Sequence, residues 1–162
     1  LEKEVNSWLK REYYWGHREW PYKNIKPRII CEKLLENEIK DYKFYCFSGE
    51  PKFLYVSQGL VSDHSLLVDF FDLKWNKMPF RRMDYLPFEK NPQKPSKFND
   101  MIDICKILCK EKFFIRVDLF EVDKRVYFSE LTLYPASGYM PIEPINYDNI
   151  LGTFIKLPIN EK

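Results

Sequence analysis

The sequence lacks the features of several common classes of protein. No apolar run approaches the ~20 residues that a transmembrane helix needs. The net charge is only +2, which makes no strong case for a nucleic acid or an anionic membrane as partner. None of the four cysteines forms a CxxC pair, and only His17 and His64 are present to complete a zinc site. We therefore expect reduced cysteines, and with no secretory apolar segment near Leu1 we expect a cytoplasmic protein.

Glycine is also scarce, with five residues in the chain and no glycine-rich stretch before Cys31. The 162 residues suit one domain, covering 1–162. Aromatic residues make up 17% of the chain, which fits a strand-rich core and would equally fit carbohydrate contacts. One aromatic segment, WGHREWPY, contains Trp15, His17, Arg18 and Trp20, and it either binds a sugar or packs on itself.

Periodic apolar patterns predict an α+β protein with an antiparallel sheet and packed helices. Apolar or alternating runs predict strands at 28–35, 39–47, 52–58 and 65–72. Helical spacing predicts helices at 1–14, from 98 to 109 with Ser96 as N-cap, and from 146 to a point near Gly152. A long surface connection is expected from 74 to 95. Hairpins that are segregated from the helices favour this fold class over a doubly wound sheet.

The most informative segment is FFIRVDLFEVDKRVYFSELT, residues 113–132, which predicts a β-hairpin. If residues 123–125 form the loop, Val122 pairs with Val126, Asp118 lies opposite Glu130, and Arg116 lies opposite Thr132. Opposed residues have Cβ atoms ~4.5–5.5 Å apart. On the return strand, Val126, Phe128, Glu130 and Thr132 are then expected to share a face.

Two carboxylates at that separation repel each other by ~4 kcal/mol at an effective dielectric constant of ~20. A divalent cation would offset the repulsion, since Mg²⁺ is commonly held by one or two carboxylates together with substrate phosphates. A shared proton would also relieve it. So would a two-residue turn, which would place the two acids on opposite faces.

Two separated motifs resemble those of the ATP-grasp ligases. Residues 30–34, ICEKL, resemble the hinge that holds adenine, and the stretch from Asp118 to Thr132 resembles the paired metal-binding strands. Together with EWPYKNIKPRIICEKLL, DYKFYCFSGEPKFL, RVDLFEV, YFSELTLYPASG and NILG, these motifs make residues 15–157 similar to the C-terminal two-thirds of the TupA-like ATP-grasp family. That family is linked to teichuronopeptide and other cell-surface polysaccharide biosynthesis, and its members are often labelled glycosyltransferases.

The resemblance implies an adenine-binding hinge at 29–35. Glu32 and Leu34 would contact adenine, with Lys33 in the same segment. Lys43 on the following strand would approach the phosphates, although a plain salt bridge is expected between Lys43 and Asp41.

The resemblance also implies a metal site on the hairpin. Asp118 and Glu130 would bind Mg²⁺. Thr132 stands where the fold usually has a metal-binding asparagine, so a second metal or its geometry is in doubt. Arg116 would be the catalytic residue that meets the γ-phosphate or an acyl phosphate, or it would simply pair with Asp118.

The implied activity is the ATP- and Mg²⁺-dependent ligation of a carboxylate to an amine through an acyl phosphate. A uronic acid or an amino acid on a surface-glycan precursor is a plausible substrate, and a homo-oligomer remains open. One alternative is a glycosyltransferase that uses a nucleotide sugar, although no DxD motif is present. Another is a non-catalytic nucleotide- or glycan-binding module.

The family normally has a glycine-rich loop, a further lysine and a whole N-terminal domain before the position of Leu1. We therefore expect the chain to be the C-terminal part of a larger ATP-grasp core, lacking its N-terminal domain. A natural short homologue that has lost activity is the other interpretation.

Overall fold

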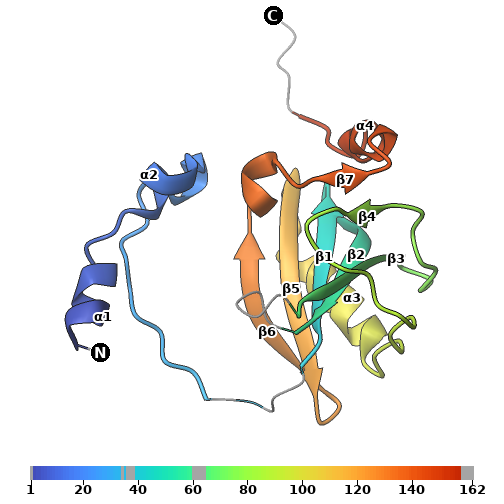
Figure 1. Ribbon diagram of the computed structural model, residues 1–162, viewed down its shortest axis with the longest axis horizontal. Coiled ribbons are helices and arrows are strands. Elements are labelled where there is room, and N and C mark those ends of the chain that lie inside the picture. Colours follow the sequence, from blue (N-terminus) through green and yellow to red (C-terminus); the bar gives the residue numbers. More distant parts are fainter. Residues whose placement is uncertain (1, 34, 36–38, 60–64, 158–162) are drawn as a thin grey trace, which may run out of the picture.

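A five-stranded antiparallel sheet forms the centre of the protein (Figure 1). The computed structural model describes residues 2–33, 35, 39–59 and 65–157. The strands follow the order β3-β2-β1-β5-β6, with the bounds β1 Asp41–Phe47, β2 Glu50–Gln58, β3 Leu67–Asp72, β5 Phe114–Val122 and β6 Arg125–Thr132. A second, two-stranded sheet pairs β4 (Arg81–Arg82) with β7 (Ile142–Glu143). The predicted α+β class with an antiparallel sheet is confirmed.

The helices are short, apart from α3 (Phe98–Leu108). The other helical segments are α1 Glu2–Trp8, α2 Tyr13–His17, η1 Trp20–Tyr22, η2 Pro135–Gly138 and α4 Asn146–Gly152. The helix predicted over residues 1–14 is interrupted, because α1 ends at Trp8 and α2 begins at Tyr13. The helix predicted to end near Gly152 does end at that residue. None of the described helices is long and apolar enough to cross a membrane.

The start of α3 differs from the prediction. Lys97 holds the N-cap position and makes no side-chain cap bond. The Ser96 hydroxyl instead donates to a carboxylate oxygen of Glu121, whose other oxygen accepts from the Lys97 backbone N–H. Glu121 therefore anchors the helix start to β5.

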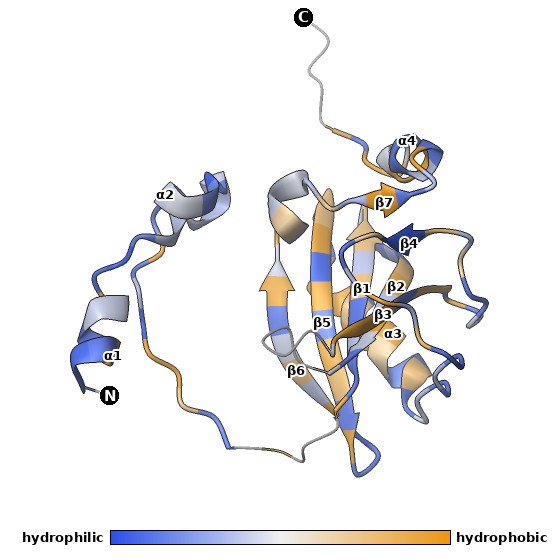
Figure 2. Cartoon of the chain, in the orientation of Figure 1, coloured by the Kyte–Doolittle hydropathy of each residue, from blue (hydrophilic) through white to orange (hydrophobic). Residues whose placement is uncertain are grey.

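One face of the sheet packs against α3. The alternation of β1 places Tyr42, Phe44 and Cys46 on this face, as its pattern predicts, and all three are buried. The helix contributes Met101 and Cys105, both fully buried. Figure 2 shows the resulting hydrophobic bands along the strands and along α3.

The opposite face is divided between an aromatic core and a polar region. At one end, buried Phe47, Phe53 and Phe70 pack with Phe80 and Leu151, beneath the segments that carry β4, β7 and α4. Farther along β1 and β5 the same face carries charged side chains. Figure 2 shows these hydrophilic positions within otherwise hydrophobic strands. The fold thus leaves a polar region at the β1-β5-β6 edge.

The N-terminal arm, residues 2–33, lies beside β6 and is linked to the following segment by hydrogen bonds (Figure 1). The Leu133 N–H donates to the Tyr22 hydroxyl at 2.7 Å, and the Ser137 hydroxyl donates to Glu19 at 2.9 Å. The predicted buried strand at 28–35 is wrong for the described part of that segment. Residues 28–33 are exposed and outside any strand, and Ile30 is 80% exposed, because no neighbouring strand pairs with them.

Candidate functional site

The β5-β6 hairpin has a tighter turn than the sequence predicted. Val122 pairs with Arg125, so the turn contains two residues, Asp123 and Lys124. Both have positive φ, 51° and 59°, as the favoured two-residue hairpin turn requires. Near the turn the predicted register is therefore wrong by one residue.

A β-bulge between the turn and the acidic residues shifts the pairing by one residue, which restores the predicted register at Asp118 and Glu130. Leu119 pairs with Phe128, whereas Asp118 pairs with Glu130, so Ser129 is the extra residue in β6. The predicted pairing of Asp118 with Glu130 is confirmed, as is that of Arg116 with Thr132.

The bulge also changes which side chains of β6 share a face. Val126 belongs to the α3 side, where it packs against the core, and Phe128 lies opposite Leu119 of that same core. Glu130 lies opposite Asp118 on the polar side. The expectation that Val126, Phe128, Glu130 and Thr132 share a face is therefore wrong, because the bulge at Ser129 switches the side.

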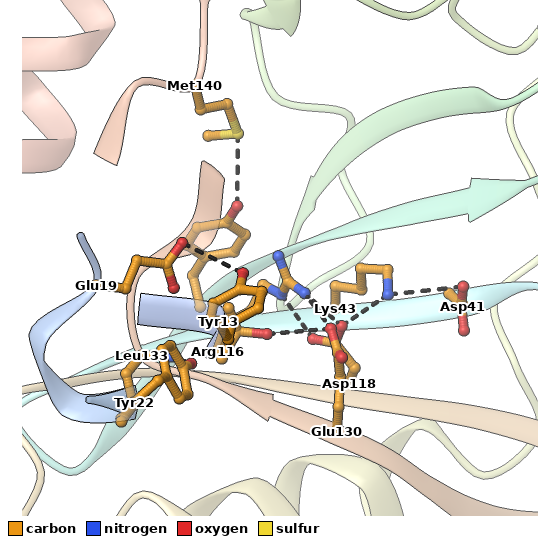
Figure 3. Close-up of polar contacts among 12 residues, drawn as sticks. Tyr13, Glu19, Tyr22, Asp41, Lys43, Arg116, Asp118, Glu130, Leu133 and Met140 are labelled. Carbon is orange, nitrogen blue, oxygen red and sulfur yellow. Dashed lines mark hydrogen bonds and ion pairs between the residues drawn. The ribbon is translucent and has the colours of Figure 1, made fainter. Parts of the chain in front are cut away.

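Two cations neutralise the paired acids (Figure 3). The Arg116 guanidinium donates to both oxygens of Asp118, each at 2.7 Å, and its Nη2 donates to Glu130 Oε1 at 2.8 Å. Lys43 Nζ donates to Asp118 Oδ2 at 2.6 Å. Asp118 is fully buried, and Thr132 Oγ1 donates to Glu130 at 3.1 Å. Charge-assisted bonds of this length are strong, and they hold the group in one arrangement.

Lys43 reaches Asp118 because β1 and β5 are adjacent and Lys43 pairs with Asp118 in register. The expected salt bridge with Asp41 is also present, at 3.6 Å. Burial alone would lower the pKa of Lys43, but Asp118 and Asp41 raise it above its ordinary value. Lys43 thus stays charged. We call Asp41, Lys43, Arg116, Asp118 and Glu130 the ionic cluster.

The same environment disfavours the charge on Asp41. Burial raises the pKa of this carboxyl group, and it stays raised although Lys43 opposes the shift. A carboxyl group whose pKa is higher in the folded state stabilises the fold at low pH, and this contribution is lost as the pH rises through the carboxyl range. Ionised Asp41 therefore costs stability at neutral pH.

Asp41→Asn should consequently be slightly more stable than the wild type at pH 7. The gain is small because the Asp41 side chain is 39% exposed. The difference should vanish below about pH 3.5, where the aspartate is protonated. Urea unfolding of the wild type and Asp41→Asn at pH 7 and below about pH 3.5 measures this difference in the free energy of unfolding. A loss of stability at pH 7 would mean that the pair with Lys43 outweighs the cost of burial.

A cleft of about 1280 Å³ lies between the N-terminal arm and the hairpin. Arg116, Glu130 and Thr132 line it from the sheet. The arm contributes tyrosines and cations, and η2 contributes the far rim. The residues that line the cleft from the arm and η2 include Arg11, Tyr13, Glu19, Tyr22, Lys26, Arg28, Ala136 and Ser137.

The structure brings together five of the eight site residues that the sequence singled out. Arg116, Asp118, Glu130, Thr132 and Lys43 form one connected group through the bonds given above. The described hinge residues Glu32 and Lys33 do not join this group. Glu32 and Lys33 are exposed and do not line the cleft. Leu34 lies outside the described residues, so the adenine-binding role of the hinge stays a prediction.

Sequence reasoning did not single out Glu19. It is 6% exposed and contacts Ser137, 118 positions away. The local sequence pattern does not indicate that Glu19 is buried. Its neighbour Trp20 is 65% exposed, and the described segment that follows Glu19 forms a short 3₁₀ turn with no apolar periodicity to read. Its burial follows from the position of the arm against η2.

Glu130 and Thr132 line the cleft, and their oxygens suit magnesium when substrate phosphates supply further ligands. Asp118 is fully buried and does not line the cleft, so its role as a ligand stays a prediction. A carboxylate offers about four lone-pair sites. Asp118 uses three of them, and no described residue donates to Glu130 Oε2. In the described part of the chain, no group of three or more His, Cys, Asp or Glu side chains could hold a metal alone. Mg²⁺ does not need one, since one or two carboxylates with phosphates suffice.

The family model described as TupA-like ATPgrasp covers residues 1–156. No curated protein and no solved structure matches the chain.

Proposed function

The chain belongs to the TupA-like ATP-grasp family, and on this basis we propose that it serves an ATP- and magnesium-dependent carboxylate–amine ligase. The reaction would proceed through an acyl phosphate, in cell-surface polysaccharide biosynthesis. Its substrates would be a carboxylate, such as a uronic acid, and an amine, such as an amino acid or an amine on a glycan precursor. The observation that carries the proposal is the ionic cluster beside the cleft.

Arg116 has donors to spare for an anion in the cleft. A guanidinium group has five N–H donors, and Asp118 and Glu130 take three of them. No described residue accepts from Nη1, and Arg116 lines the cleft. Asp118 holds the guanidinium plane in a fixed orientation through two bonds. We therefore assign Arg116 to the γ-phosphate or the acyl phosphate, where a preoriented cation stabilises developing negative charge.

The ionic cluster carries one excess negative charge, since three carboxylates face two cations. The excess belongs to Asp41 beside Lys43, because Lys43 and Arg116 already balance Asp118 and Glu130. A further cation on the hairpin would therefore accompany the negative charge of substrate phosphates. Asp118, Glu130 and Thr132 would hold Mg²⁺, which when bound neutralises phosphate charge. Lys43 would approach the phosphates, and the hinge, with Glu32, Lys33 and Leu34, would hold adenine.

A calorimetric titration with ATP and Mg²⁺ tests the proposal, with Glu130→Ala as the variant. The loss of even an outer-shell partner of a metal site typically weakens binding about 10–100-fold, so loss of a ligand should cost at least about tenfold. Glu130 is 57% exposed, so its removal should leave the fold intact. ATP without Mg²⁺ should bind weakly to both proteins.

Glu89→Ala is the matched control, because Glu89 is an exposed glutamate outside the cleft. It should bind ATP and Mg²⁺ as the wild type does. Equal affinity in wild type and Glu130→Ala would contradict the metal assignment. Binding of a nucleotide sugar in place of ATP would support the glycosyltransferase alternative, and nucleotide binding with no turnover would support a binding module.

A further inference from the structure

A buried carboxylate with one free oxygen lies in the wall of the cleft. Glu19 is 6% exposed, and its Oε1 accepts from the Ser137 hydroxyl at 2.9 Å and from the Tyr13 hydroxyl at 3.5 Å. Glu19 Oε2 accepts no hydrogen bond from a described residue. We propose that Glu19 binds the ammonium group of the amine substrate. The inference rests on the proposed ligase function, whose second substrate it places.

The position of Glu19 is held by groups on both sides of the cleft. Ser137 donates to it from a backbone with φ 53°, between Ala136 at 50° and Gly138 at 82°. Consecutive left-handed residues are costly where a side chain is present and persist when the surroundings impose them. Tyr13 donates from the arm, and burial, with Glu19 nearby, raises its pKa, so the hydroxyl keeps its proton. Both donors go to the same oxygen and leave the other one available.

A carboxylate as buried as that of Glu19 is costly unless a cation, hydrogen bonds or water reach its oxygens. Oε2 is not sealed from solvent, so it is open to a ligand in the cleft that Glu19 lines. Among the described residues, no lysine, arginine or histidine forms an ion pair with Glu19. An ammonium group supplies both the positive charge and several N–H donors. A neutral or anionic ligand group would leave the charge of Glu19 uncompensated.

Glu19 also lies close to the proposed reaction site. Glu19, Tyr22, Arg116 and Glu130 line the same cleft, and the charges of Glu19, Glu130 and Arg116 all act on the Tyr22 hydroxyl. Figure 3 shows Glu19 and Tyr13 on one side of the ionic cluster. An amine on Glu19 would therefore share the cleft with a carboxyl group activated at Arg116.

The other cations that line the cleft indicate which kind of amine substrate it fits. Arg11, Lys26 and Arg28 line it from the arm, and none of them forms an ion pair with a described residue. They would suit an anionic group on the same substrate. The cleft thus fits an amine that also carries a carboxylate or a phosphate.

The experiment is an NMR titration of the ¹⁵N-labelled chain with ethylammonium chloride at constant ionic strength. Tetramethylammonium chloride is the matched ligand, since it has the same charge and no N–H donor. We expect saturable shifts of the Ser137 and Leu133 amide signals with ethylammonium alone. In Glu19→Gln the affinity should fall at least tenfold, although the amide oxygen can still accept from Ser137 and Tyr13.

Glu12→Gln is the control variant, because Glu12 is an exposed glutamate of the same arm whose carboxylate accepts, among the described residues, only from Trp15. It should bind ethylammonium as the wild type does. Equal shifts in Glu19→Gln, equal shifts with tetramethylammonium, or no shifts at all would overturn the inference. Titration of ATP with Mg²⁺ into the same proteins separates the two proposals. Ammonium binding that depends on Glu19, without ATP binding, would contradict the proposed function and leave the ammonium site standing.

Discussion

Asp118→Ala is expected to lower the free energy of unfolding by about 3 kcal/mol, the lower end of the cost of breaking a buried ion pair. The Asp118 side chain is fully buried, and the side chains of Arg116 and Lys43 are only 9% and 15% exposed. Removing the carboxylate leaves two cations with little water and fewer acceptors. Glu130 remains on Arg116 and Asp41 on Lys43, which is why we expect the lower end.

Urea unfolding at pH 7 measures this loss, with Asp103→Ala as the control. Asp103 is 73% exposed on α3 and pairs with Lys106 at 3.3 Å. Exposed pairs of this kind contribute about 0–1 kcal/mol, so the control should unfold almost as the wild type does. A loss of less than about 1 kcal/mol in Asp118→Ala would mean that water reaches Arg116 and Lys43, and that the ionic cluster is not a preorganised site.

The sequence predicted the pairing of the two acids for a reason that was only partly right. It assumed a three-residue loop, whereas the hairpin has a two-residue turn followed by a bulge at Ser129. Both arrangements place Asp118 opposite Glu130, because each puts one more residue between them than a regular two-residue hairpin does, in the loop or in β6. A bulge has no strong local signature, and this one follows from the need to direct Val126 to the core and Glu130 to the polar face.

The sequence predicted only in part which groups offset the negative charges of Asp118 and Glu130. Local reasoning on the hairpin suggested a metal, a shared proton or separated acids. The sequence also left open that Arg116 pairs with Asp118, and the structure shows this pair within β5. The bond from Lys43 to Asp118 requires β1 to lie beside β5, although the two residues are 75 positions apart in the sequence. Because Arg116 and Lys43 already balance the charges of Asp118 and Glu130, the proposed magnesium depends on the negative charge that substrate phosphates would bring.

The segments that the sequence described least well are those whose structure depends on distant contacts. Residues 28–35 predicted a strand because they contain a short apolar run, yet the described residues 28–33 have no partner strand. The cleft and Glu19 depend on bonds between the arm and residues more than a hundred positions away, from Tyr22 to Leu133 and from Glu19 to Ser137. Periodicity reports which side of an element is apolar, and it carries no information about such contacts.

The face of β1 that packs on α3 is the clearest case in which periodicity alone predicted the buried residues. A substitution on this face should have a large effect on stability. Phe44→Ala should lower the free energy of unfolding by about 3–5 kcal/mol, the usual cost of removing a buried phenylalanine ring. Phe44 is fully buried on the central strand, and its ring lies 5.8 Å from that of Phe98 at the start of α3. The loss combines the transfer of the ring to water with a cavity between sheet and helix.

Phe113→Ala is the matched control, since Phe113 is 52% exposed just before β5. It should change the unfolding midpoint in urea much less than Phe44→Ala does, with the same dependence on denaturant concentration. If the two variants lost similar stability, α3 would not be firmly packed on the sheet. The site would be affected as well, because α3 supports β5 from behind and Glu121 joins its start to the strand that carries Arg116 and Asp118. A weakened α3 contact should therefore also weaken ATP binding, although Phe44 lies on the opposite face from the ionic cluster.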